Sequence, residues 1–395
     1  MTLRNDSGTT FSVLDPQSEP GNPLQISFAI GTALPAGNYT VEWRTVSSDG
    51  HPSRGRFSFT VLSTPPLTAI QERSGGSSPN PAAVTSAADS ARSEDAAAPA
   101  NSLSRAVSFA GVLLVVGVIV FNLLVVARSD RIPRELVWRM ESRAAIVGVS
   151  ASMITIIAAF SRILFEVRMV RSMPGMEATT MQSVLMTTAW GAAMRLQIIA
   201  ALLALIAFTI AIKRIRGAWL IASLAGLVVA PTLALTGHAA AGTRLTALLI
   251  STDCLHVIGA SSWLGNLACV MFIGVPILVR DGGEDRWQSV AALVNTFSPV
   301  ALASATIVVL SGVIASWIHL EHLSSLWLTA YGKVLLLKLA LVMVTILIGA
   351  YNFRRVQPVL VREEGTAKLR RSAAAELSTA ALIILVTGFL TGVAP

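Results

Sequence analysis

The sequence predicts a multi-pass α-helical membrane bundle that carries a small N-terminal β domain. Hydrophobic residues make up 53% of the 395-residue chain and charged residues only 13%. The apolar residues form about eight long runs, and a polar segment with alternating apolar residues precedes them. A chain this apolar and this long does not fit one soluble core. The net charge of +8 comes from basic residues spread over short loops, so no nucleic-acid partner is expected.

Residues 1–62 are expected to form part of an Ig-like β-sandwich outside the cytoplasm. Apolar residues alternate with polar or small ones in three segments, the period of half-buried strands: 24–30, 39–43 and 57–61. Turn residues separate the last two segments at 48–52. Because about 60 residues is short for a whole sandwich, we expect only a fragment of one.

Residues 63–104 are expected to be a flexible linker, because they are rich in Ser, Ala, Pro and Gly and hold almost no large apolar side chain. The membrane domain then occupies 105–395. Its apolar runs are each long enough to cross the hydrocarbon core as a helix: 106–127, 145–165, 192–212, 217–236, 249–278, 297–318, 332–352 and 372–392.

The charge of the loops predicts the orientation. Loops after the first, third, fifth and seventh runs hold sixteen Lys or Arg, whereas the opposite loops hold three. Basic loops stay in the cytoplasm, so both termini and the β domain are expected outside.

The turn Asp49-Gly50-His51 offers an imidazole and a carboxylate two residues apart, a donor pair that suits Cu(II). The stretch LPAGNYTVEWRTVSSDGHPSRGRFSFTV (34–61) resembles the C-terminal half of the periplasmic copper protein CopC. Four membrane segments resemble CopD: TGHA (236–239), DCLHVIGASSWLGN (253–266), YGKVLLLKLALV (331–342) and ELSTAALIILVTGFLTG (376–392). The whole chain therefore resembles the fused CopC–CopD proteins of bacteria.

This resemblance implies copper uptake or resistance at the bacterial cytoplasmic membrane, with periplasmic copper chaperones as partners. In CopC-like domains an N-terminal histidine binds Cu(II) together with the residues that match Asp49 and His51. The chain starts with Met1-Thr2-Leu3-Arg4 instead, so we expect an N-terminally truncated domain with an incomplete Cu(II) site.

Ionisable residues inside the apolar runs are the next candidates, because charge is costly in a membrane. Asp253 and His256 are three residues apart and share a helix face. His256 and Lys338 lie at similar depths, about 10 Å and 9 Å below the predicted outer ends of their runs. If these side chains face the interior, they form a polar site in the outer half of the bundle; the alternative for Lys338 is to reach back to the interface.

The remaining histidines, His238, His319 and His322, also fall at predicted outer ends or loops and are candidate copper ligands. The outer loop after the second run holds Met169, Met173 and Met176. Thioethers select Cu(I), although Met also fills irregular helix contacts. Arg162 and Glu166, four residues apart at the same end, are expected to neutralise each other.

Two other functions stay open. The surroundings of His256 and Lys338 also resemble those of the membrane protoporphyrinogen oxidase HemJ, which implies a haem-binding site. Alternatively, the membrane domain only anchors a copper sensor or chaperone. The sequence has no Gly-rich nucleotide loop, CxxC motif or Asp-Lys-Thr motif, so an ATP-driven pump is not expected. Outside the haem alternative, an enzyme is not expected either. The sequence leaves the oligomeric state open.

Overall fold

The computed structural model describes residues 2–11, 13, 17–19, 22–46, 52–62, 99–172, 178–215, 217–236, 246–319 and 324–392. The chain divides into an N-terminal β unit and a helical unit that begins at Asp95. The two units are described separately.

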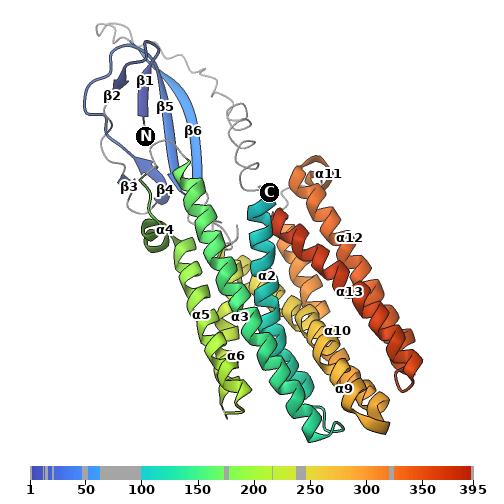
Figure 1. Ribbon diagram of the computed structural model, residues 1–395. Coiled ribbons are helices and arrows are strands. Elements are labelled where there is room, and N and C mark those ends of the chain that lie inside the picture. Colours follow the sequence, from blue (N-terminus) through green and yellow to red (C-terminus); the bar gives the residue numbers. More distant parts are fainter. Residues whose placement is uncertain are drawn as a thin grey trace. The chain divides into compact units, whose positions relative to one another are not determined.

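The β unit contains two small antiparallel sheets (Figure 1). The larger sheet has the strand order β2-β1-β5-β6, from β2 (Thr10–Phe11), β1 (Thr2–Asn5), β5 (Gly37–Val46) and β6 (Pro52–Val61). The smaller one pairs β3 (Gln17–Glu19) with β4 (Asn22–Ser27). This confirms the predicted antiparallel β domain and adds β1, β2 and β3, where the sequence shows no clear alternation.

A small aromatic core holds the larger sheet together. Leu3, Tyr39 and Val41 are buried, and the ring of Tyr39 stacks on Phe59 with 5.6 Å between the centroids. The Tyr39 hydroxyl donates a hydrogen bond of 2.7 Å to the carbonyl oxygen of Pro35. The alternation seen in the sequence therefore points one side of β5 into this core.

Eight helical segments of the described chain are long and apolar enough to span a membrane, which confirms the predicted number. They are Pro99–Val126, Arg134–Arg171, Ala189–Ile212, Ala218–Leu235, Ala247–Asp281, Gly283–Ile318, Ala330–Val359 and Glu363–Leu390. Helix α2 begins at Pro99, so the end of the segment expected to be linker is helical.

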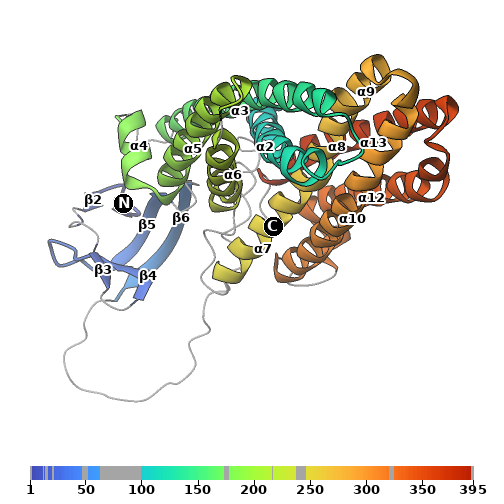
Figure 2. The same cartoon turned by 90° about the horizontal axis from the view of Figure 1, so that it is seen from below.

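Helix α2 (Pro99–Val120) lies in the middle of the bundle (Figure 2). On one side it packs against α3 (Arg134–Arg171) and α6 (Ala218–Leu235), with α5 (Ala189–Ile212) behind them. On the other side it contacts α13 (Glu363–Leu390). Helix α7 (Thr246–Ala260) packs against α10 (Arg286–His319), and α12 (Ala330–Tyr351) packs against α13.

Several spans contain π-helical segments, which are rare and often occur at functional sites. Helix α7 continues through η4 (Ser261–Gly265). It then runs through α8 (Asn266–Cys269) and η5 (Val270–Gly274) into α9 (Val275–Asp281). Helix α12 continues into η7 (Asn352–Val356). These segments change which side chains face the bundle interior.

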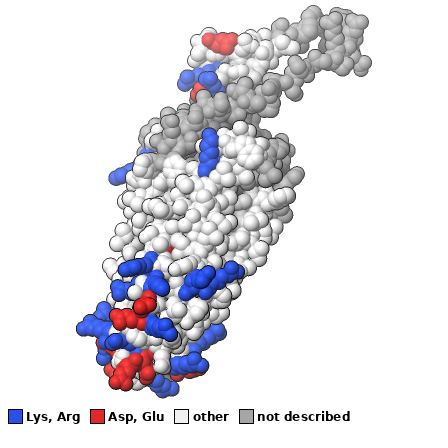
Figure 3. All heavy atoms as spheres, turned by 90° about the vertical axis from the view of Figure 1, so that its right-hand side faces the viewer, with Lys and Arg blue, Asp and Glu red and all other residues white. Residues whose placement is uncertain are grey.

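Lys, Arg, Asp and Glu gather at one end of the helical unit, which we call the basic end (Figure 3). It carries the connections after η2 (Phe121–Val126), α5, α9 and η7. Arg139 bridges Glu135 and Asp281 there, each at 3.0 Å. Because Asp281 ends α9 and Arg139 lies in α3, this pair links two spans at the basic end.

Helix α2 and η4 cross with their backbones in contact. A side chain at Gly117 would collide with the backbone of Gly265, and one at Gly265 would collide with Leu113 and Gly117. Small residues allow this close approach in membrane helices. The crossing fixes where η4, and with it Trp263, lies in the bundle.

Gly265→Ala is therefore expected to force the two helices apart and to lower the free energy of unfolding by about 1–3 kcal/mol, the usual cost of overpacking. The measurement is thermal unfolding of the purified protein in detergent. Gly312→Ala in α10 is the matched control, because its added methyl group would meet His256 Cε1 at 3.5 Å, an ordinary contact. Equal melting temperatures for the two variants would contradict the tight crossing.

Candidate functional site

The imidazole of His256 projects from α7 onto α10. Its Nδ1 lies 3.0 Å from the hydroxyl oxygen of Ser311. That hydroxyl donates its own hydrogen to the carbonyl oxygen of Ile307, at 2.6 Å. Since this hydroxyl hydrogen is committed to α10, Nδ1 is the donor to Ser311 in the tautomer that leaves a lone pair on Nε2, and the ring also forms a hydrogen bond with the backbone of Val308. A histidine held in this way through one nitrogen is arranged as metal-binding histidines usually are.

Asp253 and Lys338 lie in the same layer. The charge of Lys338, from α12, interacts with both His256 and Asp253. Asp253 also interacts with Tyr331, one residue into α12. The structure thus brings together the three residues that were placed in one layer from helix periodicity and depth. We call Asp253, His256, Ser311 and Lys338 the His256 layer.

The His256 layer could supply two metal ligands, an imidazole nitrogen and a carboxylate. Within the described part of the chain, no group of three or more His, Cys, Asp or Glu side chains is placed to hold a metal ion. Lys338 competes with any incoming cation for Asp253, because both are positive. The arrangement therefore suits a cation that binds briefly rather than one that is held as a structural metal.

Most of the other predicted ligands fall outside the described residues. These are Asp49, His51, His238, His322, Met173 and Met176, and of His319 only the backbone is described, as the last residue of α10. Met169 is half-buried near the end of α3. The structure therefore leaves the predicted turn site and the Met cluster as predictions.

Two further methionines of this region differ in their surroundings. Met194 is fully buried with Ile163, Val167 and Trp190, so for this residue the structure favours the packing interpretation over Cu(I) binding. Met186 is exposed, and its sulfur accepts a hydrogen bond of 2.6 Å from Arg195.

Arg162 and Glu166 are part of a larger buried charge cluster than the sequence indicated. The charges of Arg162, Glu166 and Arg105 of α2 interact, and all three side chains are buried. The guanidinium of Arg162 also lies over the ring of Trp190, 5.9 Å from its centroid. The charges of Arg162 and Glu166 therefore do not simply neutralise each other, because the charge of Arg105 also interacts with Glu166.

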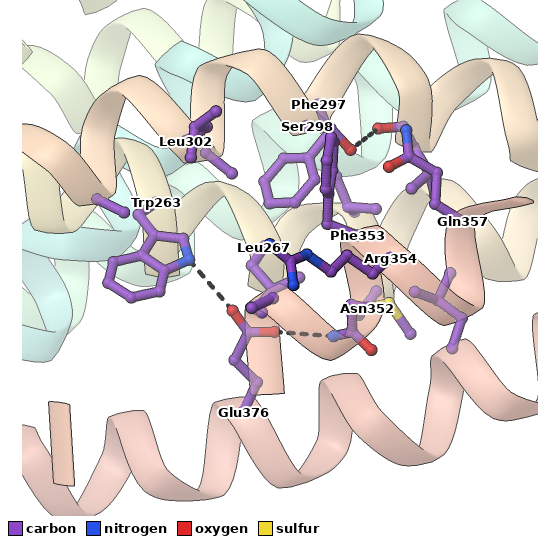
Figure 4. A pocket seen from close by; sticks show the side chains of 18 of the residues that line it. Trp263, Leu267, Phe297, Ser298, Leu302, Asn352, Phe353, Arg354, Gln357 and Glu376 are labelled. Atoms are coloured by element: carbon purple, nitrogen blue, oxygen red, sulfur yellow. Dashed lines mark hydrogen bonds between the residues drawn. The ribbon is translucent and has the colours of Figure 1, made fainter. Parts of the chain in front are cut away.

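A second polar site, which the sequence reasoning missed, surrounds Glu376 of α13 (Figure 4). Trp263 of η4 donates from Nε1 to Glu376 Oε1, and Asn352 of η7 donates from Nδ2 to Oε2, both at 3.1 Å. The three residues border a cavity of about 330 Å³ between α10, α12 and α13. The one signal in the sequence was a glutamate inside an apolar run.

The ionic coupling in the His256 layer can be tested by a double-mutant cycle. Asp253→Asn should destabilise the protein, because it leaves the charge of Lys338 buried without its counter-ion. Lys338→Met in the same chain should restore much of the loss, with a coupling of about 0.5–3 kcal/mol between residues in one network. Thermal unfolding in detergent measures all four proteins, and additive effects would show that the two residues do not interact.

Comparisons with known proteins assign the parts of the chain to copper-related families. The CopC domain model matches residues 1–62, the model of the copper resistance protein D-like N-terminal domain matches 95–248, and copper resistance protein D matches 291–390. No solved structure matches the chain.

Two relatives also carry copper-related names. The copper transport protein CutJ of Bacillus subtilis (strain 168) is 26% identical over 372 residues, which cover 91% of this chain and 61% of that protein. The chain thus spans less than two thirds of that relative. Copper resistance protein C of Escherichia coli is 64% identical over 28 residues, 7% of this chain and 22% of that protein. The order of the three matches, a CopC domain ahead of the two parts of a CopD membrane domain, is the architecture of a fused CopC–CopD protein.

Proposed function

We propose that this protein binds copper at the His256 layer and carries it inward across the bacterial cytoplasmic membrane. The family and the eight spans make its function copper-related and membrane-bound. The observation that supports the finer proposal is the imidazole of His256, which lies 3.0 Å from Ser311 through Nδ1 and follows Asp253 by three residues on α7, inside an apolar bundle. A neutral imidazole nitrogen is a good copper ligand.

The proposal includes the orientation expected from the loops. With the basic end in the cytoplasm, the His256 layer lies in the outer half of the membrane. Copper would then reach it from the exterior, from Cu(II) at Asp49 and His51 of a full-length β domain or from Cu(I) at Met169, Met173 and Met176. Both supply sites are proposals that rest on ligand chemistry.

Lys338 has a defined part in this proposal. In the absence of copper its ammonium group balances Asp253, so the layer is neutral inside the membrane. A Cu(I) ion that binds His256 Nε2 and Asp253 would take over this counter-charge one for one, and the ammonium group of Lys338 would be displaced from Asp253. The site is then reset each time the ion leaves, because Lys338 returns to Asp253.

Two substitutions in the His256 layer should therefore lower copper binding to different extents. His256→Ala should remove the metal from this layer, and Ser311→Ala should weaken it by about 10–100-fold, the usual effect of losing the partner that orients a ligand. The measurement is the affinity of the purified full-length protein for Ag(I), a redox-inert substitute for Cu(I), together with copper accumulation by expressing cells. Ser251→Ala is the control, because this exposed serine on α7 only bonds to the carbonyl oxygen of Ala247.

Unchanged affinity and unchanged accumulation in His256→Ala would contradict the proposal. Equal copper accumulation with and without the second to eighth spans would instead favour the anchored sensor or chaperone, since those spans would then be dispensable for copper handling.

The haem interpretation rests on the same two residues. His256 and Lys338 interact in the structure, as a shared haem site would need. A Soret band in the purified protein that disappears in His256→Ala would support this second function, and a colourless preparation would exclude it.

A further inference from the structure

Glu376 is buried deep in a membrane-spanning helix. Only 4% of the residue is exposed, and it follows Arg371, the last charged residue before it on α13, by five positions. At a rise of 1.5 Å per residue this is about 8 Å along the helix. An ionised carboxylate without a cation is very costly in such surroundings. Its charge must be neutralised by a bound proton or by a cation.

The described neighbours of Glu376 do not neutralise it. Its two hydrogen bonds come from Trp263 and Asn352, which are neutral donors. Arg354 of η7 is the other ionisable side chain among the residues that border the cavity, and no ion pair joins it to Glu376 in the described part of the chain. The other elements around α13 carry Arg105 on α2, Lys333 and Lys338 on α12 and Arg355 on η7, and α13 itself carries Lys368, Arg370 and Arg371 before Glu376. Among the described residues no ion pair joins any of them to Glu376, and η4 and α8 contribute no charge.

Both donors come from π-helical segments. Trp263 lies in η4 and Asn352 opens η7. A π-helical turn holds one residue more than an α-helical turn, so it redirects the side chains that follow. Two different spans are thus distorted where they meet the same carboxyl group. This is the pattern expected of a site with a function rather than of simple packing.

The cavity connects Glu376 with the basic end. It extends from Trp263 to Arg354, Gln357 and Leu360, which lie where η7 and η8 (Gln357–Val359) leave the bundle. Its volume of about 330 Å³ has room for several waters at ~30 Å³ each. The buried Oδ1 of Asn352 has no hydrogen-bond partner in the described structure, so it offers an acceptor to such water. Most of the cavity lining is apolar, so Glu376, Asn352, Arg354 and Gln357 are the groups that would hold such water and give a proton a route between Glu376 and the basic end.

A polar stripe joins Glu376 to the His256 layer. Lys338 and Thr345 of α12 and Asn352, the first residue of η7, follow one another at seven-residue spacing, close to two helical turns, and so lie on one face of this span. Thr345 is fully buried and donates a hydrogen bond of 3.0 Å to Thr379, three residues after Glu376 on α13. The stripe begins in the His256 layer and ends at the residue that binds Glu376.

We propose that Glu376 is a proton-binding carboxyl group that couples copper passage to proton movement. The carboxyl group is protonated while no metal cation is near. When a monovalent cation arrives from the His256 layer, the O–H bond breaks and the proton passes to the water of the cavity. One positive charge replaces another, so the net charge inside the bundle is unchanged. The coupling rests on the copper transport proposed above, whereas proton binding at Glu376 does not.

Infrared difference spectroscopy of the reconstituted full-length protein tests proton binding directly. Titration with pH should reveal the C=O band of a protonated buried carboxyl group that is absent in Glu376→Gln. Glu364→Gln, an exposed glutamate at the start of the same helix, should keep the band. Trp263→Phe should keep it as well but shift it to higher frequency, because the carbonyl loses a hydrogen bond. A spectrum of Glu376→Gln identical to that of the unmodified protein would overturn the proposal.

Coupling is tested in vesicles that enclose a pH-sensitive dye. Ag(I) added outside should cause proton movement with the unmodified protein and with Glu364→Gln, and none with Glu376→Gln. Ag(I) flux with undiminished proton movement in Glu376→Gln would overturn the coupling while leaving copper transport intact. No Ag(I) flux in any protein, together with an infrared band assigned to Glu376, would overturn the proposed transport and its coupling but support the proton site.

Discussion

In the two candidate sites of this bundle, each buried polar side chain has a polar partner that offsets its removal from water, and that pairing organises this part of the membrane domain. His256 is tied to Ser311, Asp253 interacts with Lys338, and Glu376 accepts hydrogen bonds from Trp263 and Asn352. The apolar surroundings make each of these partners energetically important. Because every partner comes from a different helix, the same interactions that satisfy the polar groups also fix how the spans meet.

The polar groups form two layers served by the same helices. Helix α12 contributes Lys338 to one layer, and η7, which follows it, contributes Asn352 to the other. The span that begins with α7 does the same through His256 and Trp263. The close crossing of Gly117 and Gly265 holds the span that begins with α7 against α2, next to Trp263. A displacement of either of these two spans in one layer therefore also moves residues of the other layer.

Much of the fold could be predicted from the sequence, because a span needs only a long apolar run and a strand only a simple alternation. The ends were less predictable. Helix α2 starts at Pro99 inside a segment whose composition resembles a linker, because its first turns are built from small polar residues. Strands β1 to β3 are short, and their pairing rather than their composition defines them.

The residues of the candidate site could be predicted where helix spacing and depth alone determine their position. Asp253 and His256 share a face through their spacing, and depth places Lys338 beside them. Ser311 could not be found in this way, since it resembles the other serines of the spans until α10 is placed against α7. Glu376 was missed because a span predicted to start at 372 puts it near water, whereas α13 extends back to Glu363. Trp263 was missed because a π-helical segment changes the phase on which periodicity depends.

The central claim is that His256 Nε2 is a copper ligand. X-ray absorption at the copper edge tests it most directly, on the full-length membrane protein loaded with one equivalent of Cu(I) and carrying His51→Ala to silence the turn of the β unit. The account predicts the multiple-scattering signature of an imidazole ligand, and its loss when His256→Ala is added. An imidazole signature that survives this second substitution would place the copper at another histidine and contradict the account.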